Sequence, residues 1–185
     1  MDDDSTPIEL VIIGGGNMGA ALLGGLLDSG AFDASAIAVV EVVAARRDVL
    51  ASQLPGVRTE VAVPPCVGAV VAVKPADTPA AASAAGASGA TRVLSIAAGV
   101  RLATIEAAAG PDVAVIRAMP NTPALVRLGA CAIAAGATAD RDDVSWARRI
   151  LEAVGTVDAV DEPALDAFTG VAGSGKSSLI HGNVP

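Results

Sequence analysis

The residues best suited to do chemistry form a glycine-rich turn near the start of the chain. Gly14, Gly16 and Gly19 fit the pattern G-x-G-x-x-G, with Asn17 and Met18 between the last two glycines. In this pattern the first glycine permits a tight turn, the second lets the backbone approach a pyrophosphate, and the third lets helix and strand pack closely. A helix that begins there presents its free N–H groups to the phosphates. The motif predicts dinucleotide binding, with a purely structural glycine turn as the alternative.

An acidic residue and two arginines further along bear on which dinucleotide would bind. Glu41 lies 22 positions after Gly19, where an acidic side chain at the end of a second strand hydrogen-bonds the ribose 2'-hydroxyl of NAD. Arg46 and Arg47 follow closely and could pair with the 2'-phosphate of NADP if the loop folds back. They could equally be solvated helix residues. These residues alone therefore leave NAD(H) and NADP(H) both open.

Two loops rich in proline are further candidates for a site. Lys74-Pro75 ends a buried-type strand, because a residue before proline is pushed away from the α region. Residues 119–123, Met-Pro-Asn-Thr-Pro, are expected to form a proline-bounded loop. Asn121 in this loop could face a ligand or form an Asx turn without one. Lys74 and Pro75 could likewise be a surface lysine and a simple strand stop.

Short apolar runs alternate with stretches of helical composition around these residues, which places the candidate loops between strands and helices. Strands are expected at 8–13, 37–43, 67–73, 92–97, 113–117, 130–135 and 155–160. Helices are expected at 18–27, 44–54, 78–87, 102–109 and 142–153, and another begins at 162–168. Such alternation predicts right-handed crossovers and an α/β fold, Rossmann-like and doubly wound, with a mostly parallel sheet. Loops at the carboxyl ends of its strands would meet where ligands bind.

The composition limits the possible partners. The formal net charge is -8, and only Lys74 and Lys176 among the twelve basic residues are lysines, which argues against a nucleic-acid partner. This acidic, lysine-poor surface fits a high-salt cytosol, although coding composition explains the arginine bias equally well. Hydrophobic residues make up 52% of the chain and aromatic residues 2%, so Ala, Val, Leu and Ile must build the core.

Cysteine usage and the apolar runs indicate where the protein works. Cys66 and Cys131 are two distant thiols in a chain that can form a core without them, so no disulfide scaffold is expected. The start of the chain lacks the basic region of a secretory signal, and no apolar run approaches the ~20 residues needed to cross a bilayer. We therefore expect a cytoplasmic protein with no membrane association and no metal site.

Five motifs occur in the order found in pyrroline-5-carboxylate reductases, and the chain resembles that family over about residues 8–175. They are Gly14-Gly-Gly-Asn-Met-Gly19, Val73-Lys-Pro75, Ser95-Ile-Ala-Ala-Gly99, Arg117-Ala-Met-Pro-Asn-Thr-Pro-Ala124 and Gly173-Ser-Gly175. The resemblance implies an NAD(P)-binding domain over 1–161. It also implies that 162–185 is the beginning of a C-terminal helical domain, which in the family forms an interlocked dimer.

The same resemblance implies an activity and assigns roles to residues. The activity is reduction of 1-pyrroline-5-carboxylate to L-proline by hydride transfer from NAD(P)H, the last step of proline biosynthesis. NADP(H) is the expected cofactor, with NAD(H) as the alternative. The protein would orient the two reactants and supply no nucleophile, so no catalytic residue is assigned. Val73, Lys74, Pro75, Ala98, Gly99 and Asn121 would lie near the cofactor, and Gly173, Ser174 and Gly175 would hold the substrate carboxylate.

The chain departs from the family pattern after Gly175. The family continues into a long helix, whereas here Lys176 and nine further residues end the sequence, so most of the helical domain is missing. The alternative is therefore a non-catalytic dinucleotide-binding fragment that has lost its substrate and dimerisation domain. Residues 170–177 also match G-x-x-x-x-G-K-[ST], but the strand before and the helix after that a P-loop requires are not expected. His181 is expected to be a tail residue.

Overall fold

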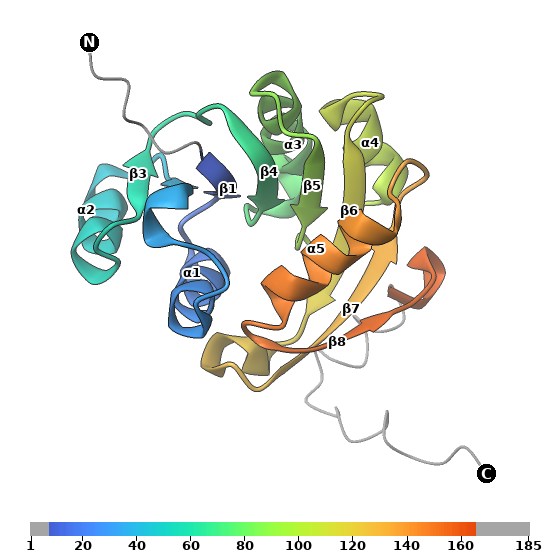
Figure 1. The fold of residues 1–185 in the computed structure, drawn as a ribbon. Coiled ribbons are helices and arrows are strands. Elements are labelled where there is room, and N and C mark those ends of the chain that lie inside the picture. Colours follow the sequence, from blue (N-terminus) through green and yellow to red (C-terminus); the bar gives the residue numbers. More distant parts are fainter. Residues whose placement is uncertain (1–7, 166–185) are drawn as a thin grey trace.

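The apolar runs of the sequence form the strands of one sheet with helices on both faces (Figure 1). The computed structural model describes residues 8–165. The strand order in the sheet is β3-β2-β1-β4-β5-β6-β7-β8. The strands are β1 (Ile8–Ile13), β2 (Ile37–Val40), β3 (Arg58–Glu60), β4 (Cys66–Val71), β5 (Arg92–Ser95), β6 (Ala114–Pro120), β7 (Gly129–Ala135) and β8 (Gly155–Ala159).

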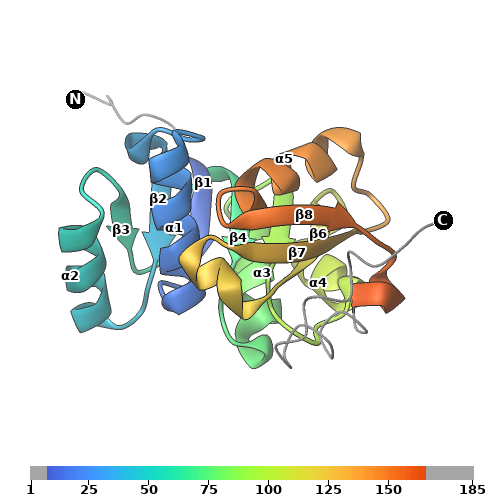
Figure 2. The same cartoon turned by 90° about the horizontal axis from the view of Figure 1, so that it is seen from below.

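The helices cover the two faces of the sheet separately. They are α1 (Asn17–Ser29), α2 (Ala44–Gln53), α3 (Thr78–Ala87), α4 (Leu102–Ala109) and α5 (Arg141–Leu151). In Figure 2, α1 and α5 lie on one side of the sheet, and α3 and α4 lie on the other. Each face encloses its own cluster of buried, mostly aliphatic side chains. Such doubly covered parallel strands are buried on both sides, which explains their nearly continuous apolar sequences.

The chain reverses its winding direction at β1, and this reversal creates a crevice. β1 pairs in parallel with β2 on one side and with β4 on the other. Ile13, the last residue of β1, lies opposite both Val40 of β2 and Val71 of β4. The carboxyl ends of the three strands are therefore level with one another. In open α/β sheets, ligands bind outside the carboxyl ends of the strands at such a switch point.

At the β7-β8 edge of the sheet, the strand direction reverses. β7 is antiparallel to β6, with Pro120 opposite Cys131, and β8 is parallel to β7. Between them, α5 begins with a capping box, in which the Asp140 side chain accepts from the Asp143 backbone and the Asp143 side chain accepts from the Asp140 backbone. After β8 a helical turn begins at residue 162. Leu165 in this turn is buried in the cluster that also includes residues of α3 and α4.

The doubly wound, mostly parallel sheet is confirmed, and some of the expected details are wrong. The expected strand at 37–43 ends at Val40, the last residue that pairs with β1 and with β3. The expected loop at 119–123 is partly strand: β6 continues to Pro120, and a 3-10 helix, η3 (Thr122–Val126), follows. Antiparallel pairing with β7 keeps the chain extended through Pro120. The short strand β3 was not expected from the sequence.

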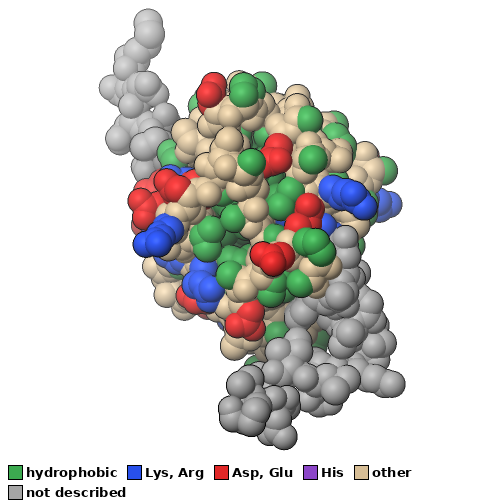
Figure 3. All heavy atoms as spheres, turned by 90° about the vertical axis from the view of Figure 1, so that its right-hand side faces the viewer, with side chains coloured by type: hydrophobic (Ala, Val, Ile, Leu, Met, Phe, Trp, Pro, Cys, Tyr) green, Lys and Arg blue, Asp and Glu red, His purple; other side chains and the backbone are tan. Residues whose placement is uncertain are grey.

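The surface agrees with an acidic chain of mixed charge. Figure 3 shows acidic and basic side chains scattered among apolar ones on one face of the molecule, with no broad basic patch on that face. Within residues 8–165, no helix combines the length and the apolar character needed to span a bilayer.

Candidate functional site

The three glycines of the motif have the three different environments that phosphate binding requires. Gly14 has φ of +110°, and a Cβ there would lie 2.6 Å from the carbonyl oxygen of Ala72 on the neighbouring chain segment. A Cβ on Gly19 would overlap the carbonyl oxygen of Gly14, so helix and turn can touch only without a side chain. Gly16 faces open space, with nothing within 4 Å of an added Cβ. The turn is thus tight at Gly14 and Gly19 and accessible at Gly16.

Helix α1 begins directly at this open position. Gly16 is its N-cap, no side chain caps the helix, and its first turn contains no acidic residue. The first hydrogen bond of this helix runs from the N–H of Ala20 to the carbonyl of Gly16 at 2.9 Å. The N–H groups of Asn17, Met18 and Gly19 therefore belong to the uncapped first turn, at the positive end of the helix dipole. This arrangement suits an anion such as a pyrophosphate.

The middle residue of the turn, Gly15, is held from both sides by charged side chains. Its N–H donates to Oε2 of Glu41 at 3.1 Å. Its carbonyl accepts from Nε of Arg46 at 2.7 Å. The other carboxylate oxygen of Glu41 accepts from the N–H of Val43 at 2.9 Å. Glu41 and Arg46 thus fix the turn to the segment after β2, and we call these two contacts the Gly15 clamp.

The second arginine also bonds to backbone. Nη1 of Arg47 donates to the carbonyls of Glu41 at 2.8 Å and of Val42 at 3.0 Å. Both arginines are partly buried and bonded to backbone, Arg46 to the glycine turn after β1 and Arg47 to the segment after β2. They are therefore not freely solvated helix residues, and their pairing with a 2'-phosphate stays a prediction.

A cavity of about 400 Å³ lies at the switch point, between the glycine turn and the ends of β2 and β4. It brings together Gly14, Gly16, Glu41, Val73 and Lys74, all of which the sequence singled out. The sequence did not point to the other lining residues, which are Ile13, Val40, Val42, Val43, Ala72 and Asp77. In the sequence, the apolar pair Val42-Val43 directly after Glu41 was the one available signal, and it concerned these two residues alone.

The remaining candidates near the cofactor lie on the same edge of the sheet but outside the lining of this cavity. Pro75 begins the short 3-10 helix η2 (Pro75–Asp77), whose last residue does line it. Ala98 and Gly99 follow β5, and Gly99 has φ of +74°. Asn121 follows β6 and is buried, and its Oδ1 accepts from the N–H of Ala130 at 3.0 Å. That bond braces the connection between β6 and β7.

The expected substrate-binding residues, Gly173, Ser174 and Gly175, lie outside the described residues. So do the P-loop-like pattern and His181. Their roles stay predictions.

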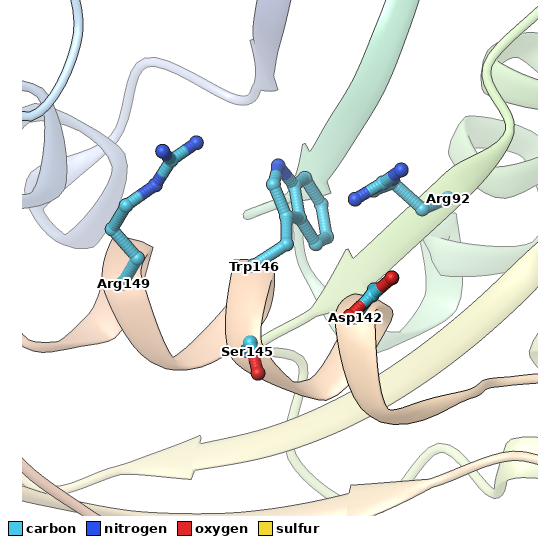
Figure 4. A pocket seen from close by; sticks show the side chains of 5 residues that line it. All are labelled: Arg92, Asp142, Ser145, Trp146 and Arg149. Carbon is cyan, nitrogen blue, oxygen red and sulfur yellow. The ribbon is translucent and has the colours of Figure 1, made fainter.

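A second pocket, of about 290 Å³, lies at the amino ends of the parallel strands, opposite the end that carries the glycine turn. Figure 4 shows Arg92, Trp146 and Arg149 around it, together with Asp142 and Ser145. Arg92 is the first residue of β5, so this pocket is at the amino end of that strand, away from the glycine turn. Arg92 lies over the Trp146 ring at 5.6 Å and 3.6 Å from an Asp143 oxygen. None of the residues singled out from the sequence lines this pocket.

Comparison with known proteins places this geometry in context. Residues 9–99 match a family model described as NADP oxidoreductase, coenzyme F420-dependent. The chain is 42% identical over 177 residues to the pyrroline-5-carboxylate reductase of Synechocystis sp., covering 91% of this chain and 64% of that protein. It is 37% identical over 177 residues to the Mycobacterium tuberculosis enzyme of the same name, covering 90% and 60%. The chain therefore spans less than two thirds of the length of these relatives.

Solved structures that resemble this chain also include pyrroline-5-carboxylate reductases. A pyrroline-5-carboxylate reductase from Coxiella burnetii superposes with a TM-score of 0.83 and 30% identity, covering 94% of this chain and 67% of the other. The Plasmodium falciparum enzyme with NADP bound gives a TM-score of 0.77 at 20% identity, covering 93% and 64%, and so supports the fold alone.

Proposed function

Because the chain belongs to the pyrroline-5-carboxylate reductase family, we propose that it provides the dinucleotide-binding part of an enzyme that reduces 1-pyrroline-5-carboxylate to L-proline. The observation that carries this proposal is the cavity at the switch point, where an uncapped helix N-terminus meets an open glycine. The names of the relatives supply the substrate.

The residues that surround the cavity fit a nicotinamide dinucleotide. Gly16 and the first turn of α1 would hold the pyrophosphate, since space and N–H donors coincide there. Glu41 would lie at the ribose end, and Val42 and Val43, which also line the cavity, would offer apolar surface beside it. When bound, NAD(P)H supplies the hydride for the imine carbon. The protein contributes orientation and exclusion of water, for which no metal or nucleophile is needed.

The far end of the cofactor is assigned through the likeness to the family. We propose that Lys74, Pro75, Ala98, Gly99 and Asn121 surround the nicotinamide, because the loops that carry them follow parallel strands and lie on one edge of the sheet. Gly173, Ser174 and Gly175 would hold the substrate carboxylate. In this proposal residues 1–161 form the nucleotide domain, residues 162–185 begin the helical domain, the whole protein forms a dimer, and it works in the cytoplasm.

The test combines binding with turnover on the 185-residue chain. Oxidation of NADPH and of NADH is followed with 1-pyrroline-5-carboxylate at low and at multimolar salt. A titration of each dinucleotide, monitored by fluorescence, runs alongside. The proposal expects saturable dinucleotide binding and, where the substrate site is complete, turnover that depends on the imine.

The outcomes separate the proposed function from its alternative. Turnover by this chain supports the reductase directly. Binding without turnover favours the dinucleotide-binding fragment that the sequence also allows. A chain that is folded by circular dichroism yet binds neither dinucleotide would contradict both.

A further inference from the structure

We propose that the second pocket, lined by Arg92, Asp142, Ser145, Trp146 and Arg149, binds a small oxyanion, the phosphate or carboxylate group of a metabolite. The pocket lies at the amino end of β5, whereas the glycine turn follows the carboxyl end of β1. β1, β4 and β5 are parallel, so the two sites lie at opposite ends of these strands. The inference therefore does not depend on the dinucleotide site or on what occupies it.

One stripe of α5 and the start of one strand build the pocket. Ser145, Trp146 and Arg149 lie three, four and seven positions after Asp142, a spacing that places all four on one side of a helix. Arg92 faces them from the first position of β5. Figure 4 shows the Trp146 ring between the guanidinium groups of Arg92 and Arg149. Two cations thus reach the same pocket from different elements.

The guanidinium of Arg92 is the observation that carries the inference, because it lacks hydrogen-bond acceptors. The side chain is 28% exposed, and its Nε is buried without a hydrogen-bond partner among the described residues. Oδ1 of Asp143 lies 3.6 Å from this Nε, which is too far for a hydrogen bond. The other oxygen of Asp143 accepts from the N–H of Asp140 in the capping box. An oxyanion that accepts from the terminal nitrogens of Arg92 would supply what the protein does not.

Arg149 provides the second positive charge. Its guanidinium lies 4.7 Å from the centroid of the Phe32 ring, and it donates no hydrogen bond within residues 8–165. The contact with the ring uses the charge of the guanidinium and leaves its N–H donors for an acceptor. Phosphate and carboxylate groups accept charge-assisted hydrogen bonds from arginine, and two arginines at one pocket therefore favour an oxyanion.

The charge and size of the pocket agree with this ligand class. Two arginines and one aspartate give the lining a net charge of +1, on a chain whose formal charge is -8. A positive pocket raises the local concentration of anions. Its volume of about 290 Å³ is near the lower limit for small-molecule sites, about 300 Å³, so a small metabolite fits better than a dinucleotide. Asp142 opposes an anion, and this opposition provides a test.

The experiment titrates the 185-residue chain with inorganic phosphate and with succinate in a calorimeter, at constant ionic strength, with chloride as the reference anion. Emission of Trp146, the only tryptophan, is recorded in parallel as a local reporter. The phosphate and succinate arms distinguish the two sources of the oxyanion.

Five variants locate the binding. Arg149→Gln removes an exposed cation of the lining, and Arg92→Lys keeps the charge but loses the planar fork of donors. Asp142→Asn removes the opposing carboxylate. Arg141→Gln, at an exposed arginine on α5 outside the lining, is the control for a general loss of charge. Gly16→Ala tests for binding at the glycine turn.

We expect saturable binding of at least one of the two oxyanions. Arg149→Gln and Arg92→Lys should each weaken it about tenfold, as for the loss of a charge-assisted hydrogen bond. Asp142→Asn should tighten it about threefold, because a like charge is removed. Arg141→Gln and Gly16→Ala should stay within about twofold of the unmodified chain.

Four results would overturn the inference. The first is a response to phosphate and succinate no larger than that to chloride. The second is equal affinity in Arg149→Gln, Arg92→Lys and Arg141→Gln. The third is weaker binding by Asp142→Asn, and the fourth is loss of binding in Gly16→Ala, which would place the anion at the glycine turn. Circular dichroism confirms that each variant is folded, and Arg149→Gln and Asp142→Asn still decide the matter if the change at Arg92 disturbs packing.

Discussion

Glu162 and Arg117 form an ion pair that joins the chain after β8 to the interior of the sheet. Oε1 of Glu162 accepts from Nη1 of Arg117 at 3.0 Å, and the Arg117 side chain is 1% exposed. The same oxygen accepts from the N–H of Leu102, the first residue of α4, at 2.6 Å. Arg101, the N-cap of that helix, contributes no side-chain cap. Glu162 therefore caps α4 from a distant part of the sequence.

Loss of this carboxylate should destabilise the fold. Glu162→Ala leaves the Arg117 charge without this partner and the N–H of Leu102 without an acceptor. We expect the free energy of unfolding to fall on the order of 2 kcal/mol, less than for a fully buried pair because Glu162 is partly exposed. Urea unfolding measures this change. Glu152→Ala, at an exposed position at the end of α5, is the control. Equal, small losses in both variants would contradict the capping role.

Two substitutions in the glycine turn should affect stability and dinucleotide affinity separately. In Gly19→Ala the new Cβ overlaps the Gly14 carbonyl, so we expect a loss of stability of about 1–3 kcal/mol, as for overpacked sites. In Gly16→Ala the Cβ meets open space, and φ of -66° suits alanine. Its stability should stay within about 0.5 kcal/mol, while affinity for either dinucleotide falls at least about tenfold, because the Cβ occupies the phosphate position. Thermal melts and titrations measure the two effects, and unimpaired binding by Gly16→Ala would contradict this assignment.

The packing of α5 on the sheet depends on a glycine in β4. A Cβ on Gly68 would lie 2.6 Å from the Trp146 ring and 3.1 Å from Cγ of Arg92, the two side chains that stack beside the second pocket (Figure 4). Gly68→Ala should therefore displace the ring and cost about 1–3 kcal/mol. Trp146 is the only tryptophan, so its emission spectrum reports the displacement directly. A variant with an unshifted spectrum and unchanged stability would show that the Cβ fits without displacing the Trp146 ring, and would contradict this prediction.

The stability should fall at alkaline pH because of a buried thiol. Burial raises the pKa of Cys131 from 9.0 to about 11. Between these values the unfolded state releases the proton first, so the contribution of this thiol to the free energy of unfolding is constant below pH about 9 and is lost toward pH about 11. The full effect is about 2–3 kcal/mol. Urea unfolding across this range should show the decline in the unmodified chain and a smaller one in Cys131→Ala. Parallel curves for the two proteins would exclude this thiol as the cause.

The sequence predicted the centre of the fold better than its edges. β1 and β4 are largely apolar runs that begin directly after a proline, and β5 has the apolar pair Val93-Leu94 at its centre, so local patterning was sufficient to identify all three. β3 has only three residues, Arg58–Glu60, and exists because it pairs with β2. β6 extends through Pro120 because β7 pairs with it in the antiparallel direction. Both features depend on contacts between segments that the sequence does not place together.

The same distinction applies to the candidate site. Gly14, Gly16 and Glu41 were identified because their spacing reflects one strand-turn-helix unit and the strand that follows it. Asp77 was missed because its place in the cavity depends on the η2 turn after Lys74, which follows a different strand. The roles of Arg46 and Arg47 could not be decided either. The sequence does not show whether an arginine side chain faces a phosphate or donates to a backbone carbonyl.

The Gly15 clamp also has a kinetic consequence. Its contacts with Glu41 and Arg46 are made within the protein itself, so the phosphate-binding turn holds its shape before any dinucleotide arrives. Little loop ordering is then left for the binding step, and a preorganised site loses less conformational entropy on association. Rapid-mixing records of dinucleotide binding should therefore show a single phase whose rate rises linearly with ligand concentration, without a slower isomerisation behind it.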